Sequence, residues 1–387
     1  MAEWIECKIS DIGTVIGGAT PSTKKPVNYE NGTIAWITPK DLSTFTGRYI
    51  QRGERNITEI GLKSCSTQLL PKDTVLFSSR APIGYVAIAA NEVCTNQGFK
   101  SVVPNENTDP LFLYYLLKYN KDKIEGMGSG TTFKEVSGNT MKNIVVSVPT
   151  DKTVQERISS MLGSIDDKIE ENERINNNLE LQAAALFTNF YDQAETEIGF
   201  TEIIQILGGG TPKTGESSYW NGDIPFFTPK DVGSPYTLTT EKTITEEGLA
   251  HCNSRLYPIN TVFVTARGTV GKVSLPGAPM AMNQSCYALV GKDTPQLLVY
   301  FYTLKAVDRL KHKASGAVFD AITTRDFEAE NIMKLSNDDT KAFLDVAEPI
   351  YQAVLNNSIE NLRLAELRDS LLPKLMSGEL DVSNIDL

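Results

Sequence analysis

A heptad pattern between Val154 and Tyr191 places the tightest limit on how this chain can fold. Apolar side chains recur there at alternating steps of four and three residues, with two asparagines in the middle of the series. The positions are Ile158, Leu162, Ile165, Ile169, Asn172, Asn176, Leu179, Ala183, Leu186 and Phe190. No proline or glycine follows Gly163, so the pattern predicts one uninterrupted helix. At ~1.5 Å per residue, a helix of about 38 residues would reach roughly 57 Å, which indicates a spacer.

The same pattern recurs 185 residues later along the chain. Its positions are Phe343, Ala347, Ile350, Val354, Asn357, Asn361, Leu364, Arg368, Leu371 and Leu375. Asn172 and Asn176 therefore match Asn357 and Asn361, and two helices with asparagines in the same layers can pair, with the buried amides fixing their register. Alternatively, each apolar stripe packs only on its own domain. Pro349 lies within the second series, where we expect it to kink the helix or reset its start.

The stretches outside these helices also match each other. The offset between matching motifs falls slowly from 191 to 185 residues, as expected for a duplicated unit that has gained and lost loop residues. The matches pair Gly17–Pro21 with Gly208–Pro212, Thr38–Asp41 with Thr228–Asp231, Ser79–Gly84 with Ala266–Gly271, and Asn96-Gln97 with Asn283-Gln284. We therefore predict two copies of one domain-plus-helix unit. The predicted division is residues 1–150 and 195–339 as recognition domains, with 151–194 and 340–387 as the long helices.

Each domain is predicted to be a mixed α/β (α+β) fold. Short runs rich in β-branched and aromatic residues lie between Gly, Pro and Asn clusters, which is typical of strands. The predicted strands are Thr74–Ser78, Tyr85–Ala89, Ile144–Val148 and Thr261–Thr265. Helical spacing of apolar residues predicts one short helix in each copy, Pro110–Lys121 and Gln296–Lys311.

Composition narrows the functional classes. No stretch approaches the ~18 apolar residues of a membrane span, and the N-terminus lacks a basic and then apolar signal region, so we expect a cytoplasmic protein. Five cysteines without a CxxC pair argue against a disulfide framework and are expected to be small core residues. Only two histidines occur, which leaves little room for histidine-based metal sites or catalytic triads.

The net charge of −11 at first argues against a nucleic-acid ligand. The acidic residues are unevenly distributed, however. Residues 1–150 hold 16 Lys and Arg against 14 Asp and Glu, whereas residues 151–194 hold 4 against 9. The acidity is thus concentrated in the helices, where solubility is sufficient reason for it.

Motifs for catalysis are missing. Gly268–Val273 resembles a phosphate-binding loop, but Ala266 stands where the leading glycine belongs and Val273 where Ser or Thr belongs. We find neither an amino-methyltransferase motif nor a GxGxxG that follows a strand and opens a helix. The sequence therefore favours a recognition protein over an enzyme.

The shared loops contain residues suited to DNA. Arginine can read guanine and glutamine can read adenine, while lysine or backbone amides near glycine can hold phosphate. The candidate DNA-binding residues are Thr20, Lys40, Arg80, Gln97, Lys100, Thr131, Thr132 and Lys134 in the first copy, and Thr211, Lys230, Arg267 and Gln284 in the second. Shared residues can equally be kept for the fold, because Gly-Gly, Asn-Gly and Thr-Pro-Lys-Asp are turn-forming sequences. If each copy reads a different sequence, base-reading residues are expected beside these shared residues, in the divergent loops Leu42–Ile50, Val232–Thr239, Thr131–Lys134 and Ala317–Asp320.

The two Gly-Gly-x-Thr-Pro openings, the Ile165–Glu170 run (Ile-Asp-Asp-Lys-Ile-Glu) and the run from Arg363 to Leu380 together resemble the specificity subunit of type I restriction-modification systems. The resemblance covers essentially the whole chain. It implies two target recognition domains held apart by antiparallel helices, each reading one half of a bipartite duplex DNA site. It also implies a non-catalytic chain whose partners are two modification (methyltransferase) subunits and the restriction subunits, with S-adenosylmethionine, ATP and magnesium bound there.

Two alternatives stay open at this stage. The chain could be a DNA-binding subunit with its own methyltransferase or nuclease activity, or a coiled-coil adaptor that binds only proteins. Methyl transfer or nicking by the purified chain would support the first. Failure to bind any duplex with the modification partner present would support the second.

Overall fold

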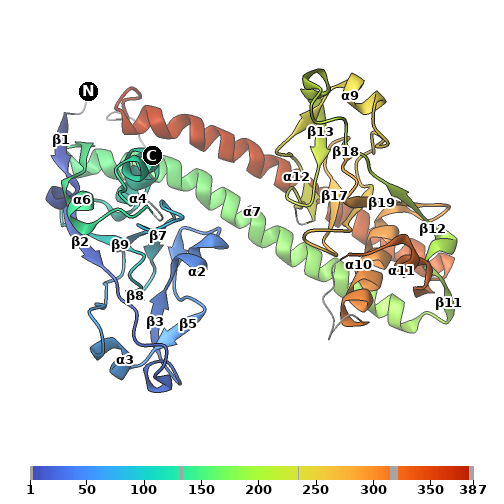
Figure 1. Ribbon diagram of the computed structural model, residues 1–387, viewed down its shortest axis with the longest axis horizontal. Coiled ribbons are helices and arrows are strands. Elements are labelled where there is room, and N and C mark those ends of the chain that lie inside the picture. Colours follow the sequence, from blue (N-terminus) through green and yellow to red (C-terminus); the bar gives the residue numbers. More distant parts are fainter. Residues whose placement is uncertain (1–2, 131–133, 234, 314–320, 383–387) are drawn as a thin grey trace. The chain divides into compact units, whose positions relative to one another are not determined.

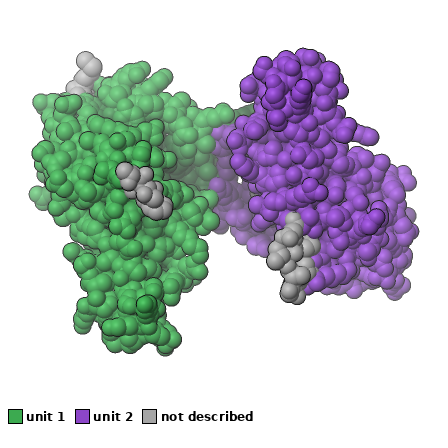
Figure 2. All heavy atoms as spheres, viewed as in Figure 1, with its two compact units in different colours: residues 1–170, 363–387 green, residues 171–362 purple. Residues whose placement is uncertain are grey.

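The computed structural model describes residues 3–130, 134–233, 235–313 and 321–382. The chain divides into two compact units, shown in Figure 2. Unit 1 comprises Met1–Glu170 and Arg363–Leu387, and unit 2 comprises Glu171–Leu362. Each unit contains one globular part together with a piece of both long helices. The four-part division at residues 150, 194 and 339 describes the sequence repeat and stays a prediction.

Unit 1 contains a five-stranded sheet in the order β2-β9-β6-β7-β4 and a three-stranded sheet in the order β5-β3-β8. Neighbours are antiparallel except for β4 with β7 and β3 with β8, which are parallel. Strands β1 and β10 pair separately and join the N-terminus to the segment before the long helix. The strands are β1 Trp4–Lys8, β2 Gly13–Gly17, β3 Ile34–Ile37, β4 Tyr49–Ile50, β5 Arg55–Ile57, β6 Val75–Phe77, β7 Val86–Ala89, β8 Cys94–Thr95, β9 Lys100–Pro104 and β10 Val145–Pro149.

Unit 2 repeats this topology strand for strand. Its sheets have the orders β12-β19-β16-β17-β14, β15-β13-β18 and β11-β20, so each strand number exceeds its counterpart by ten. The two parallel pairs recur as well, β14 with β17 and β13 with β18. The strands are β11 Thr196–Gly199, β12 Ile204–Gly208, β13 Trp220–Phe227, β14 Tyr236–Thr237, β15 Thr243–Ile244, β16 Val262–Thr265, β17 Val273–Pro276, β18 Ala281–Met282, β19 Cys286–Gly291 and β20 Asn331–Lys334. The predicted duplication of a mixed α/β domain is confirmed.

One helix in each unit packs on the five-stranded sheet and supplies much of the core (Figure 1). These are α4 Pro110–Tyr119 and α10 Gln296–Lys313, as the apolar spacing predicted. Phe112 and Tyr115 of α4 are fully buried, as are Phe301 and Tyr302 of α10. The shorter helices are α1 Ile9–Ile12, η1 Pro26–Asn28, α2 Pro39–Ser43, α3 Glu59–Lys63, α5 Lys121–Gly126, α6 Gly138–Asn143, α8 Phe200–Ile203, η2 Ser217–Tyr219, α9 Glu246–Ala250 and α11 Thr324–Glu328.

The five cysteines fall into two groups. Cys94 and Cys286 occupy matching positions in the two repeats and are buried, as predicted for small core residues. Cys7, Cys65 and Cys252 are only partly buried, so the prediction is wrong for these three.

The two long helices form as the heptad pattern predicted. Helix α7 covers Lys152–Gln193, 42 residues, and α12 covers Asn337–Met376, 40 residues. The expectation that Pro349 resets the start of α12 is wrong. Ser336 caps the first turn by accepting from the Asp339 N–H (3.1 Å), so the missing N–H of Pro349 falls inside a helix that is already established. No described helix is both long and apolar enough to cross a membrane.

In unit 2 the helices pair through their asparagines. Asn172 Nδ2 donates to Asn361 Oδ1 (2.8 Å), and Asn357 Nδ2 donates to Asn176 Oδ1 (2.8 Å). The partner numbers fall as the first numbers rise, so the helices are antiparallel. Asn172 and Asn176 are buried, and amides buried at single layers favour one register over the alternatives.

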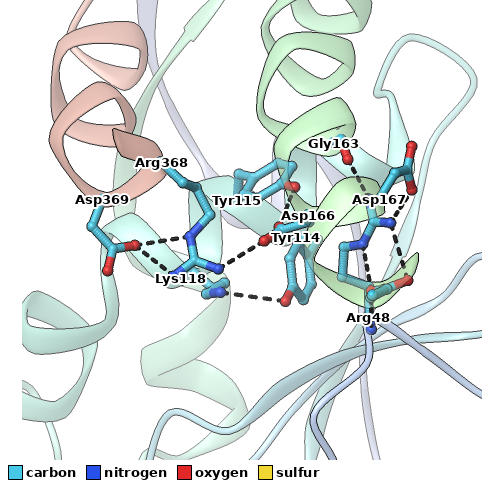
Figure 3. A network of polar contacts seen from close by, with 10 residues as sticks. Arg48, Tyr114, Tyr115, Lys118, Gly163, Asp166, Asp167, Arg368 and Asp369 are labelled. Carbon is cyan, nitrogen blue, oxygen red and sulfur yellow. Dashed lines mark hydrogen bonds and ion pairs between the residues drawn. The ribbon is translucent and has the colours of Figure 1, made fainter. Parts of the chain in front are cut away.

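In unit 1 an ionic network joins the globular part to both helices (Figure 3). Asp166 of α7 accepts from the Tyr115 hydroxyl of α4 (2.6 Å) and from Arg368 Nη1 of α12 (2.7 Å). Arg48, just before β4, forms ion pairs with Asp167 and with Glu170 of α7. Burial, followed by the Asp166 carboxylate, raises the pKa of Tyr115, so this hydroxyl stays a donor at neutral pH.

The matching place in unit 2 is aromatic and apolar instead. By the repeat, Tyr115 corresponds to Phe301, Asp166 to Tyr351 and Arg368 to Ala183. These three side chains belong to one buried apolar cluster. Phe301 and Tyr351 pack edge to face with ring centroids 5.6 Å apart. The contact between the globular part and the two long helices is therefore ionic in unit 1 and apolar in unit 2.

Candidate nucleic-acid interface

In unit 1 the shared motifs, far apart in sequence, converge on the turn Asn96–Gly98. The Asn96 N–H donates to the Ile37 carbonyl (3.0 Å) beside Thr38–Asp41, and the Ser79 N–H donates to the Gly98 carbonyl (2.7 Å). Gly18 lies so close that a Cβ added there would sit 2.2 Å from the Asn96 carbonyl oxygen. Only glycine permits this approach, which explains the Gly-Gly opening. We call the four shared motifs around this turn the motif cluster; they are Gly17–Pro21, Thr38–Asp41, Ser79–Gly84 and Asn96-Gln97.

Unit 2 builds the same motif cluster around Asn283–Ser285. The Asn283 N–H donates to the Phe227 carbonyl (3.0 Å), and the Ala266 N–H donates to the Ser285 carbonyl (2.8 Å). A Cβ at Gly209 would lie 2.1 Å from the Asn283 carbonyl oxygen. The candidate residues of both copies are therefore gathered by the backbone of the repeat.

The candidate threonines and glutamines are partners within each motif cluster. The Thr20 hydroxyl donates to Gln97 Oε1, and the Thr211 hydroxyl donates to Gln284 Oε1. Both glutamines are exposed, and their Nε2 groups make no hydrogen bond to the described residues. Each glutamine is thus held by one atom and retains a donor for an external acceptor such as a base edge.

The two candidate lysines of the Thr-Pro-Lys-Asp motif are exposed and paired with acids. Lys40 Nζ lies 2.7 Å from Glu54 Oε2, and Lys230 Nζ lies 3.9 Å from Glu241 Oε2. Hydrogen bonding to Glu54 raises the pKa of Lys40, which stays charged. Such exposed pairs stabilise little, so a phosphate can compete for either lysine.

The neighbouring aspartates shape these loops. Asp41 Oδ2 accepts from the Thr38 N–H and hydroxyl (both 2.7 Å), and its Oδ1 accepts from the Glu54 N–H (2.7 Å). Asp231 makes the equivalent bonds to Thr228 and to the Glu241 N–H. The aspartate of this motif is therefore a structural residue that fixes the loop carrying the lysine.

Arg80 and Lys100 of unit 1 share one acidic partner. Glu135 Oε2 lies 3.0 Å from Arg80 Nε, and its Oε1 accepts from Lys100 Nζ at 3.4 Å. Arg80 and Glu135 also face each other in an isolated β-bridge. In unit 2 the corresponding bridge joins Arg267 to Ala321.

Of the remaining DNA-binding candidates, Lys134 alone lies within the described residues. Lys134 is exposed, whereas Thr131, Thr132 and the whole loop Ala317–Asp320 lie outside the described residues. The divergent loop Leu42–Ile50 borders a groove of about 610 Å³ whose lining includes Lys40, Phe45, Tyr49 and Arg52. Cations beside aromatic rings suit a nucleic-acid strand. In unit 2 a groove of about 340 Å³ includes Lys230 and Lys242 but touches no residue of Val232–Thr239.

Sequence reasoning missed the acids that organise these cations. Glu54 follows Lys40 by 14 residues, whereas Glu241 follows Lys230 by 11, so the shared pairing is hidden by a loop-length difference. Glu135 has no acidic counterpart, because Ala321 takes its place. Among the described residues, no three His, Cys, Asp or Glu side chains gather in a group that could hold a metal ion.

Comparison with known proteins gives a consistent result. A family model described as "Type I restriction modification DNA specificity domain" matches residues 1–181 and again residues 196–334. The type I restriction enzyme MjaIX specificity subunit of Methanocaldococcus jannaschii is 32% identical, covering 99% of this chain and 95% of that protein. The HindI specificity subunit of Haemophilus influenzae is 23% identical, covering 98% and 100%.

A solved structure shares the fold. The type I restriction-modification system S subunit from M. genitalium aligns with a TM-score of 0.62 at 15% identity, covering 99% of this chain and 97% of that chain. The structure thus contains two copies of one domain, each with its own motif cluster. The same family model matches both copies. This chain belongs to the type I restriction modification DNA specificity family.

Proposed function

We propose that this chain is the DNA-reading subunit of a type I restriction-modification enzyme, in which each repeated domain reads one half of a bipartite duplex target. The observation that carries the proposal is the duplicated motif cluster. Each copy gathers an exposed glutamine, a lysine and an arginine from separate loops onto one turn. Such side chains are those that hold phosphates and read base edges.

Methyl transfer and cleavage are assigned to other subunits. The curated relatives are named specificity subunits, a name that sets target choice apart from chemistry. S-adenosylmethionine, ATP and magnesium would accordingly be bound by modification and restriction subunits, and this chain would supply no catalytic residue. Methyl transfer catalysed by the purified chain alone would contradict this assignment.

The long helices are proposed to set the gap between the half-sites and to dock the modification subunits, two per chain. A face of α7 within unit 2 supports the docking role. Leu181 is 69% exposed and is followed at helical spacing by Ala184, Ala185 and Thr188, which line a shallow groove with it. Apolar side chains exposed along one helix face suit a helix of a partner protein, for which we nominate the modification subunit.

The proposal is tested by methylome sequencing of cells that carry this chain with its modification subunit. We expect one methylated motif consisting of two short specific parts with an unspecified gap of fixed length. A continuous motif would contradict reading by two domains. No methylation, together with no duplex binding by the assembled complex, would favour the adaptor role.

A further inference from the structure

Arg80 is supported along only one edge of its guanidinium group. The carboxylate of Glu135 lies 3.0 Å from Nε, while Nη1 and Nη2 make no hydrogen bond to the described residues. The Arg80 side chain is 46% exposed and that of Glu135 is 35% exposed. An arginine reads guanine through two parallel donors to O6 and N7, so support at Nε leaves the reading edge available.

Lys100 fixes the carboxylate from the other side. Its Nζ donates to Glu135 Oε1 (3.4 Å) and to the hydroxyl of buried Ser79 (3.5 Å), and its side chain is only 15% exposed. Glu135 therefore has its two oxygens engaged by two different cations. A partly exposed arrangement of this kind adds little to folding stability, but it restricts the rotamers that Arg80 can adopt.

The second copy keeps the arginine and lacks the carboxylate that supports Arg80. Ala321 stands where Glu135 stands, and Tyr287 stands where Lys100 stands. The second copy thus replaces both Glu135 and Lys100 but keeps the arginine. An arginine without such a carboxylate beside it can still neutralise phosphate, because that contact depends mainly on charge.

We propose that Glu135 is a positioning residue that orients Arg80 to read a guanine in the half-site of the first domain, whereas Arg267 holds DNA phosphate. This inference rests on the proposed function. It predicts that the two arginines, equivalent in the repeat, respond differently to the same substitution.

The test uses the complex of this chain with its modification subunits and the target defined by its methylome. Binding is measured on duplexes in which each position of the two half-sites is replaced in turn. Arg80→Lys should lose about 5- to 150-fold of the discrimination at one guanine of the first half-site, since lysine cannot make the bidentate contact. Arg267→Lys should leave discrimination in both half-sites within twofold.

Glu135→Gln identifies the positioning role. It should reduce discrimination at the same guanine as Arg80→Lys and should add no further loss there in the double variant. It removes a negative charge from the surface, so the salt dependence of binding should not weaken. A merely structural glutamate would instead lower binding to all duplexes alike. Unfolding midpoints of the variants, expected to match the wild type, exclude loss of folding.

Three results would overturn the inference. One is unchanged discrimination in Arg80→Lys. Another is additive losses at the guanine in the double variant. The third is an equal base-specific loss in Arg267→Lys, which would show that the acid does not distinguish the two arginines. If the wild-type complex does not discriminate among the duplexes, the proposed function itself fails. If the wild type discriminates and the variants behave as above, only the inference about Glu135 fails.

Discussion

Removing Arg368 should destabilise unit 1 far more than removing an exposed arginine of the same helix. The Asp166 side chain is 8% exposed and that of Arg368 is 19% exposed, and Nη1 lies 2.7 Å from Oδ1. Arg368→Met leaves a buried carboxylate with one remaining donor among the described residues, the Tyr115 hydroxyl. Breaking a buried ion pair costs about 3–5 kcal/mol, and we expect about 3 kcal/mol because some water reaches Arg368.

Urea unfolding with tryptophan fluorescence measures this cost. In a Trp220→Phe background the remaining tryptophans, Trp4 and Trp36, both belong to unit 1 and report its unfolding. With an m-value of about 1–3 kcal/mol/M, the midpoint should fall by roughly 1–3 M. Arg363→Met is the matched control. Arg363 is exposed on the same helix without a hydrogen bond to the described residues, so its loss should change stability by less than about 0.5 kcal/mol.

A second substitution separates charge from packing. Adding Asp166→Asn to Arg368→Met should recover most of the loss, because a neutral amide can still accept from Tyr115 and no unpaired charge stays buried. Equal midpoints for Arg368→Met and Arg363→Met would refute the reasoning. So would a double variant that is less stable than Arg368→Met alone.

Three further predictions follow from other parts of the molecule. Burial raises the pKa of Glu180, so its contribution to stability is present in acid and lost as pH rises through the folded-state value. Glu180→Gln should therefore be more stable than the wild type at pH 8 and lose this advantage near pH 4 in urea titrations; an unchanged pH profile would contradict the assignment. Gly209→Ala should destabilise unit 2 and weaken DNA binding, whereas Gly208→Ala, with no atom within 4 Å of its Cβ, should alter neither, as thermal melts and binding would show. Inserting four residues after Gln182 adds about 6 Å and roughly 40° to the helix, and methylome sequencing should show a gap longer by one base pair, because one base pair turns DNA by roughly 35°; an unchanged gap would show that the helices do not set it.

The long helices and the repeat could be predicted because their signals are local or periodic. The heptad spacing fixes which residues of α7 face a partner, and Asn172 and Asn176 stand out within it because they interrupt an apolar series. The expectation that Pro349 resets the start of α12 is wrong because Ser336, thirteen residues earlier, already caps the helix. A capping bond is short-range, but a serine by itself does not reveal whether it caps a helix.

The basic residues of the candidate site could be predicted from the sequence, whereas the acidic residues that pair with them could not. Shared motifs pointed to Arg80 and Lys40, yet sequence similarity could not separate these from Asp41, which holds its own loop together. Glu135 lies 55 residues from Arg80, and no spacing rule connects them. The differences between the copies held the missing information, because Glu135 and Lys100 are replaced together in the second repeat.

The ionic network of Tyr115, Asp166 and Arg368 in unit 1 could not be predicted from the sequence either. Arg368 was visible as a charge in an apolar series, but its partner Asp166 lies 202 residues away. Comparison of the copies again carries the signal, since Tyr115, Asp166 and Arg368 change together to Phe301, Tyr351 and Ala183. Such joint replacement marks groups that contact one another.

Methylome sequencing after a domain exchange tests the central claim most directly. Residues 1–150 would be replaced by the first domain of another family member and the chain expressed with its own modification subunit. If each repeat reads one half of the target, the methylated motif should change in one half and keep the other half unchanged. A change in both halves, or in neither, would contradict independent reading by two domains.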